Sequence, residues 1–197
     1  LTHKTPSALA HKDSPFAAHR LRTGHREGLF RGSLIHIFCE TISWLNQEIP
    51  SDEQLFLAAS RKLPKASIEQ DVIRQFRSYL EQKTVRQVFS LCRYPGFESR
   101  EILLYREFPF AVRENDDLLS GSIDRLVVCT KGGKACSAEI FDFKTDRIAD
   151  ESFDEKIKLY RPQLEAYRSI VSRVFSLESK SCSAKLVFLS GGRVVEV

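Results

Sequence analysis

Two short segments of this chain place charged side chains among strand-forming residues. Asp124 lies in Gly-Ser-Ile-Asp-Arg-Leu at 121–126, and both Asp142 and Lys144 lie in Ile-Phe-Asp-Phe-Lys-Thr at 140–145. Strand side chains alternate between faces, so Asp142 and Lys144 share a face, and pairing of the strands would set Asp124 beside Asp142. Carboxylates about 4 Å apart repel by roughly 4 kcal/mol at an effective dielectric of about 20. A cation such as Mg²⁺ relieves this repulsion and a lysine can stabilise charge on phosphate, so the pattern predicts a metal-dependent phosphodiesterase site.

Two further motifs stand before and after these strands. Arg-Gly-Ser-Leu-Ile-His occupies 31–36, and Tyr-Arg-Pro-Gln-Leu-Glu-Ala-Tyr occupies 160–167. Together with the acid after Gly-x-x and the Asp-x-Lys-Thr segment, they resemble the PD-(D/E)xK nuclease superfamily in its RecB-like branch. Each motif is weak by itself, and the family order over residues 31 to 167 makes the set specific. The greatest similarity is to the C-terminal nuclease domain of AddA/RecB (UvrD-type) helicase–nucleases.

The resemblance implies roles for particular residues. The metal ligands would be His36, Asp124, Asp142 and the backbone carbonyl of Phe143. The ion would be Mg²⁺, with Mn²⁺ as an alternative that accepts imidazole nitrogen more readily. Asp124, Asp142 and Lys144 would be catalytic, with the lysine orienting the attacking water or stabilising the phosphate.

Residues that contact DNA are predicted from the same resemblance and from charge. Gln163 and Tyr167 stand one helical turn apart and would hold the scissile strand. Arg125 and Thr145 are weaker candidates for phosphate contacts. Arg31 belongs to a basic cluster that could neutralise backbone phosphates, made up of Arg20, Arg22, Arg26 and Arg31 with His19 and His25.

Each of these residues also has a simpler interpretation. His36 lies off the apolar stripe of its expected helix and, by itself, would be an exposed histidine. The two aspartates could pair with neighbouring cations, and Tyr167 at helical spacing could belong to the core. Glu139 precedes Asp142 by an odd number of residues and therefore faces away from it. Glu107 matches a glutamate of related domains, and no role for it follows from the sequence.

Composition and cysteine usage limit the function classes. With 42% hydrophobic and 28% charged residues and a net charge of +4, the 197-residue chain has the profile of an ordinary globular domain. No apolar run reaches membrane-span length and no secretory signal opens the chain, which predicts a cytoplasmic protein without a membrane partner. The resemblance implies that this protein is of bacterial type. The five cysteines contain no Cys-x-x-Cys pair, so we expect reduced thiols and no iron–sulfur cluster. Cys39, Cys92 and Cys129 are predicted to be small buried hydrophobes.

The expected fold class is α/β: a restriction-endonuclease-like mixed β-sheet flanked by helices, with a helical segment inserted before the sheet. Residues 1–30 form a polar, basic lead-in, interpreted as an extended arm or linker, and 31–197 form the nuclease domain, with a helical part at 31–95 and an αβ core at 100–197. Helices are expected at 34–48 with Ser33 as N-cap, at 51–63, at 67–90, and from Pro162 in a first turn to about 177. Strands are expected at 101–110, 118–129 and 138–144, with a turn at 131–134 and a closing hairpin over 184–197.

The resemblance implies a metal-dependent DNA exonuclease acting on single-stranded ends. The chain has no methionine, even at position 1, and no Gly-x-x-x-x-Gly-Lys-Ser/Thr loop, so we expect no ATP site here and a superfamily 1 helicase domain on the same longer polypeptide. The activity would serve double-strand-break end processing and recombinational repair, with a second helicase–nuclease subunit as a candidate partner. Two alternatives remain: a catalytically silent DNA-binding module of the same fold, and a free-standing exonuclease of the phage or CRISPR-associated type.

Overall fold

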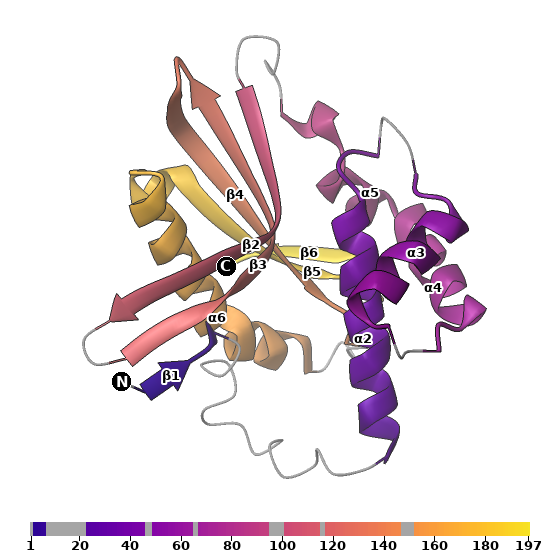
Figure 1. The fold of residues 1–197 in the computed structure, drawn as a ribbon. Coiled ribbons are helices and arrows are strands. Elements are labelled where there is room, and N and C mark those ends of the chain that lie inside the picture. The colour runs from indigo at the N-terminus through magenta and orange to yellow at the C-terminus, as the bar shows by residue number, and fades with distance from the viewer. Residues whose placement is uncertain are drawn as a thin grey trace.

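The computed structural model describes residues 2–6, 23–45, 49–64, 67–94, 101–114, 117–146 and 152–197. Its helices are α2 (Thr23–Thr41), α3 (Asp52–Lys62), α4 (Gln70–Glu81), α5 (Lys83–Val88) and α6 (Phe153–Val174), with short 3-10 turns at Leu91–Arg93 and Ser179–Ser181. The strands are β1 (Thr2–Lys4), β2 (Glu101–Glu114), β3 (Asp117–Lys131), β4 (Lys134–Lys144), β5 (Cys182–Phe188) and β6 (Arg193–Glu196). Figure 1 shows this arrangement.

Within the described residues, the strands form one mixed six-stranded sheet centred on β3. β2 pairs antiparallel with β3 along one edge. The other edge of β3 is shared: β1 pairs parallel with Asp117–Leu119, and β4 pairs antiparallel with Arg125–Lys131. β5 continues the sheet parallel to β4, and β6 follows antiparallel to β5. The predicted α/β class, with a mixed sheet flanked by helices, is therefore confirmed.

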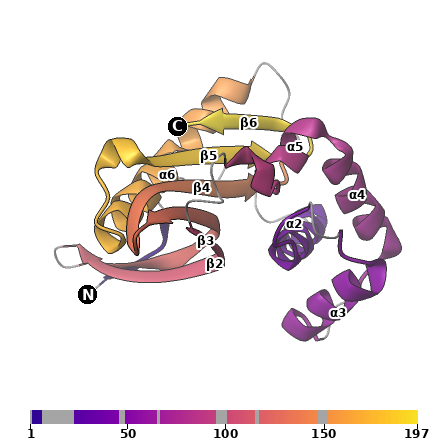
Figure 2. The ribbon, with the colours of Figure 1, turned by 90° about the horizontal axis from the view of Figure 1, so that it is seen from above.

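The helices cover the two faces of the sheet and form two cores. α2, α3, α4 and α5 gather on one side, and α6 lies along the other (Figures 1 and 2). The first core includes Phe38, Phe76 and Phe143, and the second includes Leu164 and Leu186. Each of these side chains is at most 2% exposed, so both layers bury their apolar stripes as their periodicity predicts.

Local signals located several elements well. Ser51 caps α3 in a capping box with Gln54, and α3 lies within the predicted helix at 51–63. The β3–β4 turn uses Gly132 and Gly133, whose φ angles of 58° and 75° few other residues adopt. The C-terminal strands β5 and β6 form the predicted hairpin. The third expected helix is divided at Gln82 into α4 and α5.

Two helix starts were predicted wrongly. α2 begins at Thr23 rather than at 34, and Ser33 is no N-cap: its hydroxyl donates to the carbonyl of Leu29, 3.0 Å away, inside the helix. α6 begins at Phe153, so Pro162 lies in its interior rather than in its first turn. The buried stripe of α6 continues through the proline from Tyr160 to Tyr167, and this packing offsets a proline cost of about 3 kcal/mol.

Two described parts of the lead-in belong to regular elements. Thr2–Lys4 adds a strand to the sheet, and α2 starts within the first 30 residues. The predicted phosphate contacts involve side chains that lie outside the described ones, those of His19, Arg20, Arg22, His25 and Arg26.

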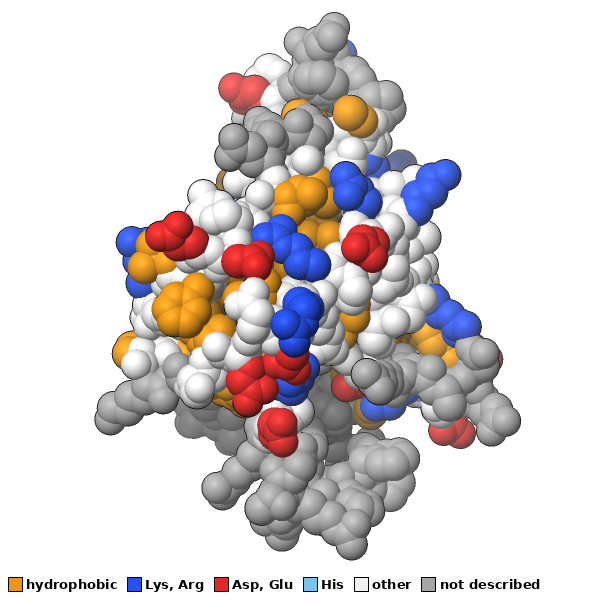
Figure 3. Space-filling view, turned by 90° about the vertical axis from the view of Figure 1, so that its right-hand side faces the viewer, with side chains coloured by type: hydrophobic (Ala, Val, Ile, Leu, Met, Phe, Trp, Pro, Cys, Tyr) orange, Lys and Arg blue, Asp and Glu red, His pale blue; other side chains and the backbone are white. Residues whose placement is uncertain are grey.

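The outer face of the helical part carries interleaved charges of both signs. Figure 3 shows acidic and basic side chains lying next to one another on this face. Arg77 pairs with Asp52 at 2.7 Å, and Arg31 pairs with Asp71 at 2.7 Å. Arg31 also donates to Gln75, 2.9 Å away. Because its guanidinium binds α4, the predicted DNA contact by Arg31 gains no support from its position.

The C-terminal end of α2 is held by two arginines of the sheet. Arg106 of β2 donates to the carbonyl of Glu40 at 2.9 Å, and Arg125 of β3 donates to the carbonyls of Ile42 and Ser43 at 3.0 and 2.6 Å. These bonds satisfy carbonyls that a helix end leaves unpaired, and α2 has no basic residue of its own in its last turn.

The prediction that Arg125 contacts DNA is wrong. The side chain is 1% exposed, and its guanidinium lies 4.8 Å from the Trp44 ring centroid and 5.0 Å from that of Phe89. Two aromatic rings and two carbonyls enclose it, so no phosphate can reach it. Strand alternation places Arg125 on the face of β3 opposite Asp124, but the sequence could not reveal that the end of α2 covers that face.

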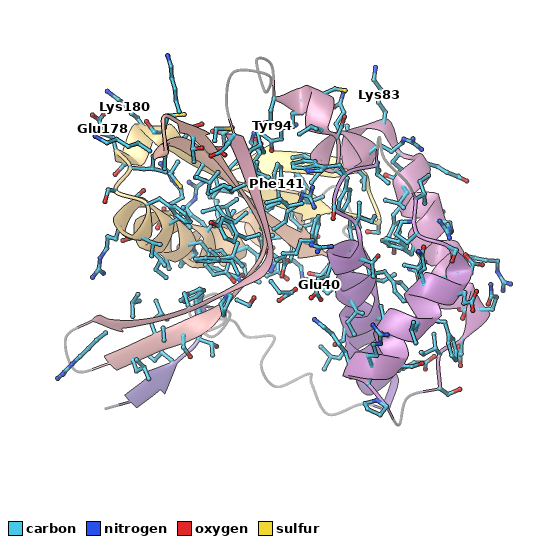
Figure 4. All side chains as sticks on the ribbon, turned by 45° about the horizontal axis from the view of Figure 1, so that its top comes forward. Glu40, Lys83, Tyr94, Phe141, Glu178 and Lys180 are labelled. Atoms are coloured by element: carbon cyan, nitrogen blue, oxygen red, sulfur yellow. The ribbon has the colours of Figure 1, made fainter. Side chains whose placement is uncertain are left out.

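A second ionic cluster lies on the face of β4 opposite Asp142. Glu139 accepts from Arg93 at 2.8 Å, from Tyr94 at 2.6 Å and from Lys185. Figure 4 labels Tyr94 and Phe141, and the cations of Arg93 and Lys185 lie 5.6 and 6.0 Å from the Phe141 ring centroid. Glu139 faces away from the aspartates, as its odd spacing predicted.

Replacing Glu139 by glutamine is expected to lower the free energy of unfolding at neutral pH by about 2 kcal/mol, because charge-assisted hydrogen bonds are lost. Burial alone would raise the pKa of Glu139, but hydrogen bonds from Arg93, Lys185 and Tyr94 lower it below its usual 4.5. The stabilisation is therefore present above about pH 4.5 and is lost as pH falls through the folded-state pKa. Urea unfolding of both proteins should give curves that converge in acid; a gap independent of pH would contradict the prediction.

Candidate active site

A cleft of about 730 Å³ opens where α2, the sheet and α6 meet. Its lining contains nearly all the charged and polar residues that the sequence motifs predicted as a site, together with several that they did not. The lining side chains with ionisable or amide groups are His36, Glu40, Lys62, Glu107, Asp124, Asp142, Lys144, Asp146, Gln163 and Tyr167.

Asp124 lies just beyond the point where the pairing between β3 and β4 ends. The β3–β4 ladder ends at the pair Arg125 and Phe141, so the register one step further sets Asp124 opposite Asp142. Instead of continuing the ladder, the Asp124 carboxylate accepts the backbone N–H of Phe143 at 2.7 Å. The side chain is 13% exposed and is held in place while one oxygen faces α2.

That oxygen pairs with His36. The imidazole Nδ1 lies 3.3 Å from Asp124 Oδ1, and the His36 ring meets Phe143 edge-on at a centroid distance of 6.4 Å. Burial favours neutral imidazole, but the charge of Asp124, its hydrogen bond and the charge of Asp142 outweigh this and raise the pKa of His36 to about 9. Burial likewise opposes ionisation of Asp124, and the pairing with His36 lowers its pKa below the usual range.

Asp142 and Lys144 share a face of β4 and form an ion pair. Lys144 Nζ lies 2.6 Å from Asp142 Oδ2, and this oxygen has no well-angled hydrogen bond within the described residues. Asp142 is 2% exposed. Burial and the charge of Asp124 raise the pKa of Asp142 despite the neighbouring lysine. The Lys144 ammonium also lies 4.2 Å from the Tyr160 ring centroid.

Gln163 and Tyr167 form a buried support beneath this pair. The Gln163 amide donates to Asp142 Oδ1 at 3.3 Å and to the Tyr167 hydroxyl at 2.8 Å, and its oxygen accepts from Lys144 at 3.2 Å. Tyr167 donates in turn to the carbonyl of Ser122 at 3.1 Å. Burial raises the pKa of Tyr167, so its hydroxyl stays neutral. Both side chains are 3% exposed. This burial suits a role in orienting Asp142 and Lys144 better than direct contact with a DNA strand.

Glu107 is the residue whose role sequence reasoning missed. The β2–β3 pairs Arg106 with Arg125 and Phe108 with Ile123 flank it, so Glu107 stands directly across from Asp124. Its φ of 53° is rare for a non-glycine residue and interrupts the regular strand at this point. Burial, followed by the charge of Asp124, raises the pKa of Glu107. Only the hairpin register reveals this opposition.

The donor set suits a divalent cation. His36, Glu107 and Asp124 each offer a ligand atom, and these three atoms lie within 4.8 Å of one another. Imidazole nitrogen with carboxylate oxygen suits Mn²⁺, and the oxygens suit Mg²⁺. Asp142, a predicted ligand, is outside this group and forms an ion pair with Lys144. Phe143, whose carbonyl is the other predicted ligand, lies between these two residues near the end of β4.

Thr145 lines the cleft, and a Cβ added at Gly32 would come within 3.1 Å of its hydroxyl, so this glycine permits close approach of α2 to the end of β4.

Cys39 and Cys129 are buried as predicted, whereas Cys92 is exposed. The Cys92 prediction is wrong because this residue sits in a short 3-10 turn after α5 rather than on a packed stripe.

None of the helices in the described ranges is both long enough and apolar enough to cross a membrane. In comparisons with known proteins, no family model matches the chain and no curated protein matches its sequence.

Proposed function

We propose that the chain is a RecB-like, metal-dependent deoxyribonuclease domain with a restriction-endonuclease-like fold. The observation that carries the proposal is the convergence of His36, Asp124 and Asp142 with Lys144 in one cleft. His36 comes from α2 and the other three residues come from the β3–β4 hairpin. A basic side chain beside clustered hard ligands is suited to phosphodiester chemistry.

Each side chain has a definable task in this proposal. His36, Asp124 and Glu107 would hold the cation, with Asp142 and the Phe143 carbonyl as additional candidate ligands. A divalent ion held by these residues would lower the pKa of a bound water molecule and neutralise negative charge on the phosphate. Lys144 stabilises negative charge that develops on the phosphate oxygens. Gln163 fixes both Asp142 and Lys144, so their separation is maintained while charge changes around them.

The wider role is proposed from the ordered motifs. We infer an exonuclease that degrades single-stranded ends, acting as the C-terminal part of a superfamily 1 helicase–nuclease in double-strand-break processing in a bacterial-type cytoplasm. The supporting observations are the Gly-x-x-x-His, Gly-x-x-Asp, Asp-x-Lys and Gln-x-x-x-Tyr segments, which meet in one cleft. A helicase would supply the separated strand to this cleft.

The direct test is cleavage of linear DNA by the purified chain with Mg²⁺, with Mn²⁺, and with a chelator. His36→Ala is expected to raise the metal concentration for half-maximal activity by about tenfold or more, since loss of a ligand or its support costs this much affinity. Mn²⁺ should restore activity better than Mg²⁺. Absence of metal-dependent cleavage by the wild type would contradict the nuclease. A lower rate at saturating metal with unchanged metal affinity would contradict the ligand role alone.

A further inference from the structure

Among the described residues, the helical part contributes one lysine to the cleft. Lys62, the last residue of α3, lines the same cleft as Asp124 and Lys144. Its ammonium pairs with Glu40 of α2, which lies one helical turn beyond His36. The described lining therefore holds two lysines, one from the sheet and one from the helical part.

Helix packing directs Lys62 towards α2. Leu55 and Ala59 are fully buried on one stripe of α3, and Lys62 follows Ala59 at helical spacing on the same side. The helix ends immediately afterwards, where the N–H of Leu63 bonds to the carbonyl of Ala59 at 2.8 Å. The buried stripe thus fixes which way the lysine projects.

The ion pair between Lys62 and Glu40 can be replaced by a contact between Lys62 and another anion. The Lys62 side chain is 47% exposed and that of Glu40 is 25% exposed, and ion pairs in contact with water contribute little to stability. Glu40 is anchored through its own carbonyl, which accepts from Arg106. Figure 4 shows Glu40 between α2 and the sheet. A phosphate entering the cleft would compete with Glu40 for the lysine.

We propose that Lys62 is a positioning residue that exchanges Glu40 for a backbone phosphate of the bound strand. Glu40 stands four residues, about 6 Å, beyond His36 along α2, so its partner Lys62 is offset along this helix from the predicted ligand His36. Lys62 therefore serves a phosphate neighbouring the one beside Lys144, and the preferred ligand is an extended strand rather than a mononucleotide. The inference rests on the proposed function.

The test is binding of a fluorescent oligothymidine to the full chain in chelator, titrated with salt. Loss of one phosphate contact in Lys62→Gln reduces the slope of log affinity against log salt by about 0.7, which is about fivefold in affinity over a tenfold range of salt. Glu40→Gln, which removes a competing charge, is expected to bind more tightly than the wild type. Matched controls are Lys180→Gln and Glu178→Gln, because these residues form an equivalent exposed pair at 2.8 Å far from the cleft (Figure 4).

The outcomes separate the two ideas. Tighter binding by Glu40→Gln with weaker, less salt-dependent binding by Lys62→Gln supports the inference. Equal losses from both substitutions would show that the pair is merely structural and would overturn it, as would a Lys62→Gln protein indistinguishable from Lys180→Gln while the wild type binds. A wild type that binds no oligothymidine would overturn the proposed function as well.

Discussion

Asp124→Asn is expected to reduce metal-dependent DNA cleavage by about a thousandfold while the protein remains folded. A carboxylate that holds the cation contributes several kcal/mol to charge stabilisation, and roughly 4 kcal/mol corresponds to three factors of ten in rate. The asparagine oxygen can still accept the N–H of Phe143, so the end of β4 keeps its position. With the negative charge gone, burial dominates at His36, and its pKa should fall from about 9.

The measurement is the rate of acid-soluble nucleotide release with Mg²⁺ and with Mn²⁺, alongside a circular dichroism melt. Asp154→Asn is the matched control, because Asp154 is an exposed acid in the first turn of α6 and does not line the cleft. Cleavage by Asp124→Asn at the level of Asp154→Asn would exclude this cleft as the catalytic centre.

Arg125→Met is expected to lower the free energy of unfolding by about 3 kcal/mol, since two carbonyls at the end of α2 lose charged donors in a buried environment. Urea denaturation measures this change. Arg106→Met is the internal comparison, because Arg106 donates to the same helix end from an exposed position and should cost much less. A smaller effect at Arg125 than at Arg106 would contradict the assigned capping role.

Local patterns predicted those parts of the fold that local interactions determine. The cap of α3 depends on residues three apart, and the β3–β4 turn depends on two adjacent glycines, so both could be read from short segments. The interior position of Pro162 depends on packing of α6 against the sheet, and no short window around the proline contains that information. The early start of α2 has no such explanation, since Glu27 and Leu29 in its first turns are exposed.

The candidate site shows the same division. His36, Asp124, Asp142, Lys144 and Gln163 could be selected from ordered motifs, and the structure brings all five to one cleft. Glu107 was given no role and Arg125 was predicted to contact DNA, since the position of one depends on hairpin register and that of the other on which helix end faces its strand. Both properties arise only when segments far apart in the chain meet.

The hydrogen bond from Phe143 to Asp124 gives the molecule an internal reporter. Because the Asp124 carboxylate accepts this amide at 2.7 Å, any gain or loss of charge at the carboxylate alters the electron density on one backbone N–H. The nitrogen–proton resonance of Phe143 therefore registers events in the cleft without any label placed there. One peak in a heteronuclear spectrum would therefore follow protonation, ion binding and DNA binding at the end of β4. It would do so without any catalytic turnover.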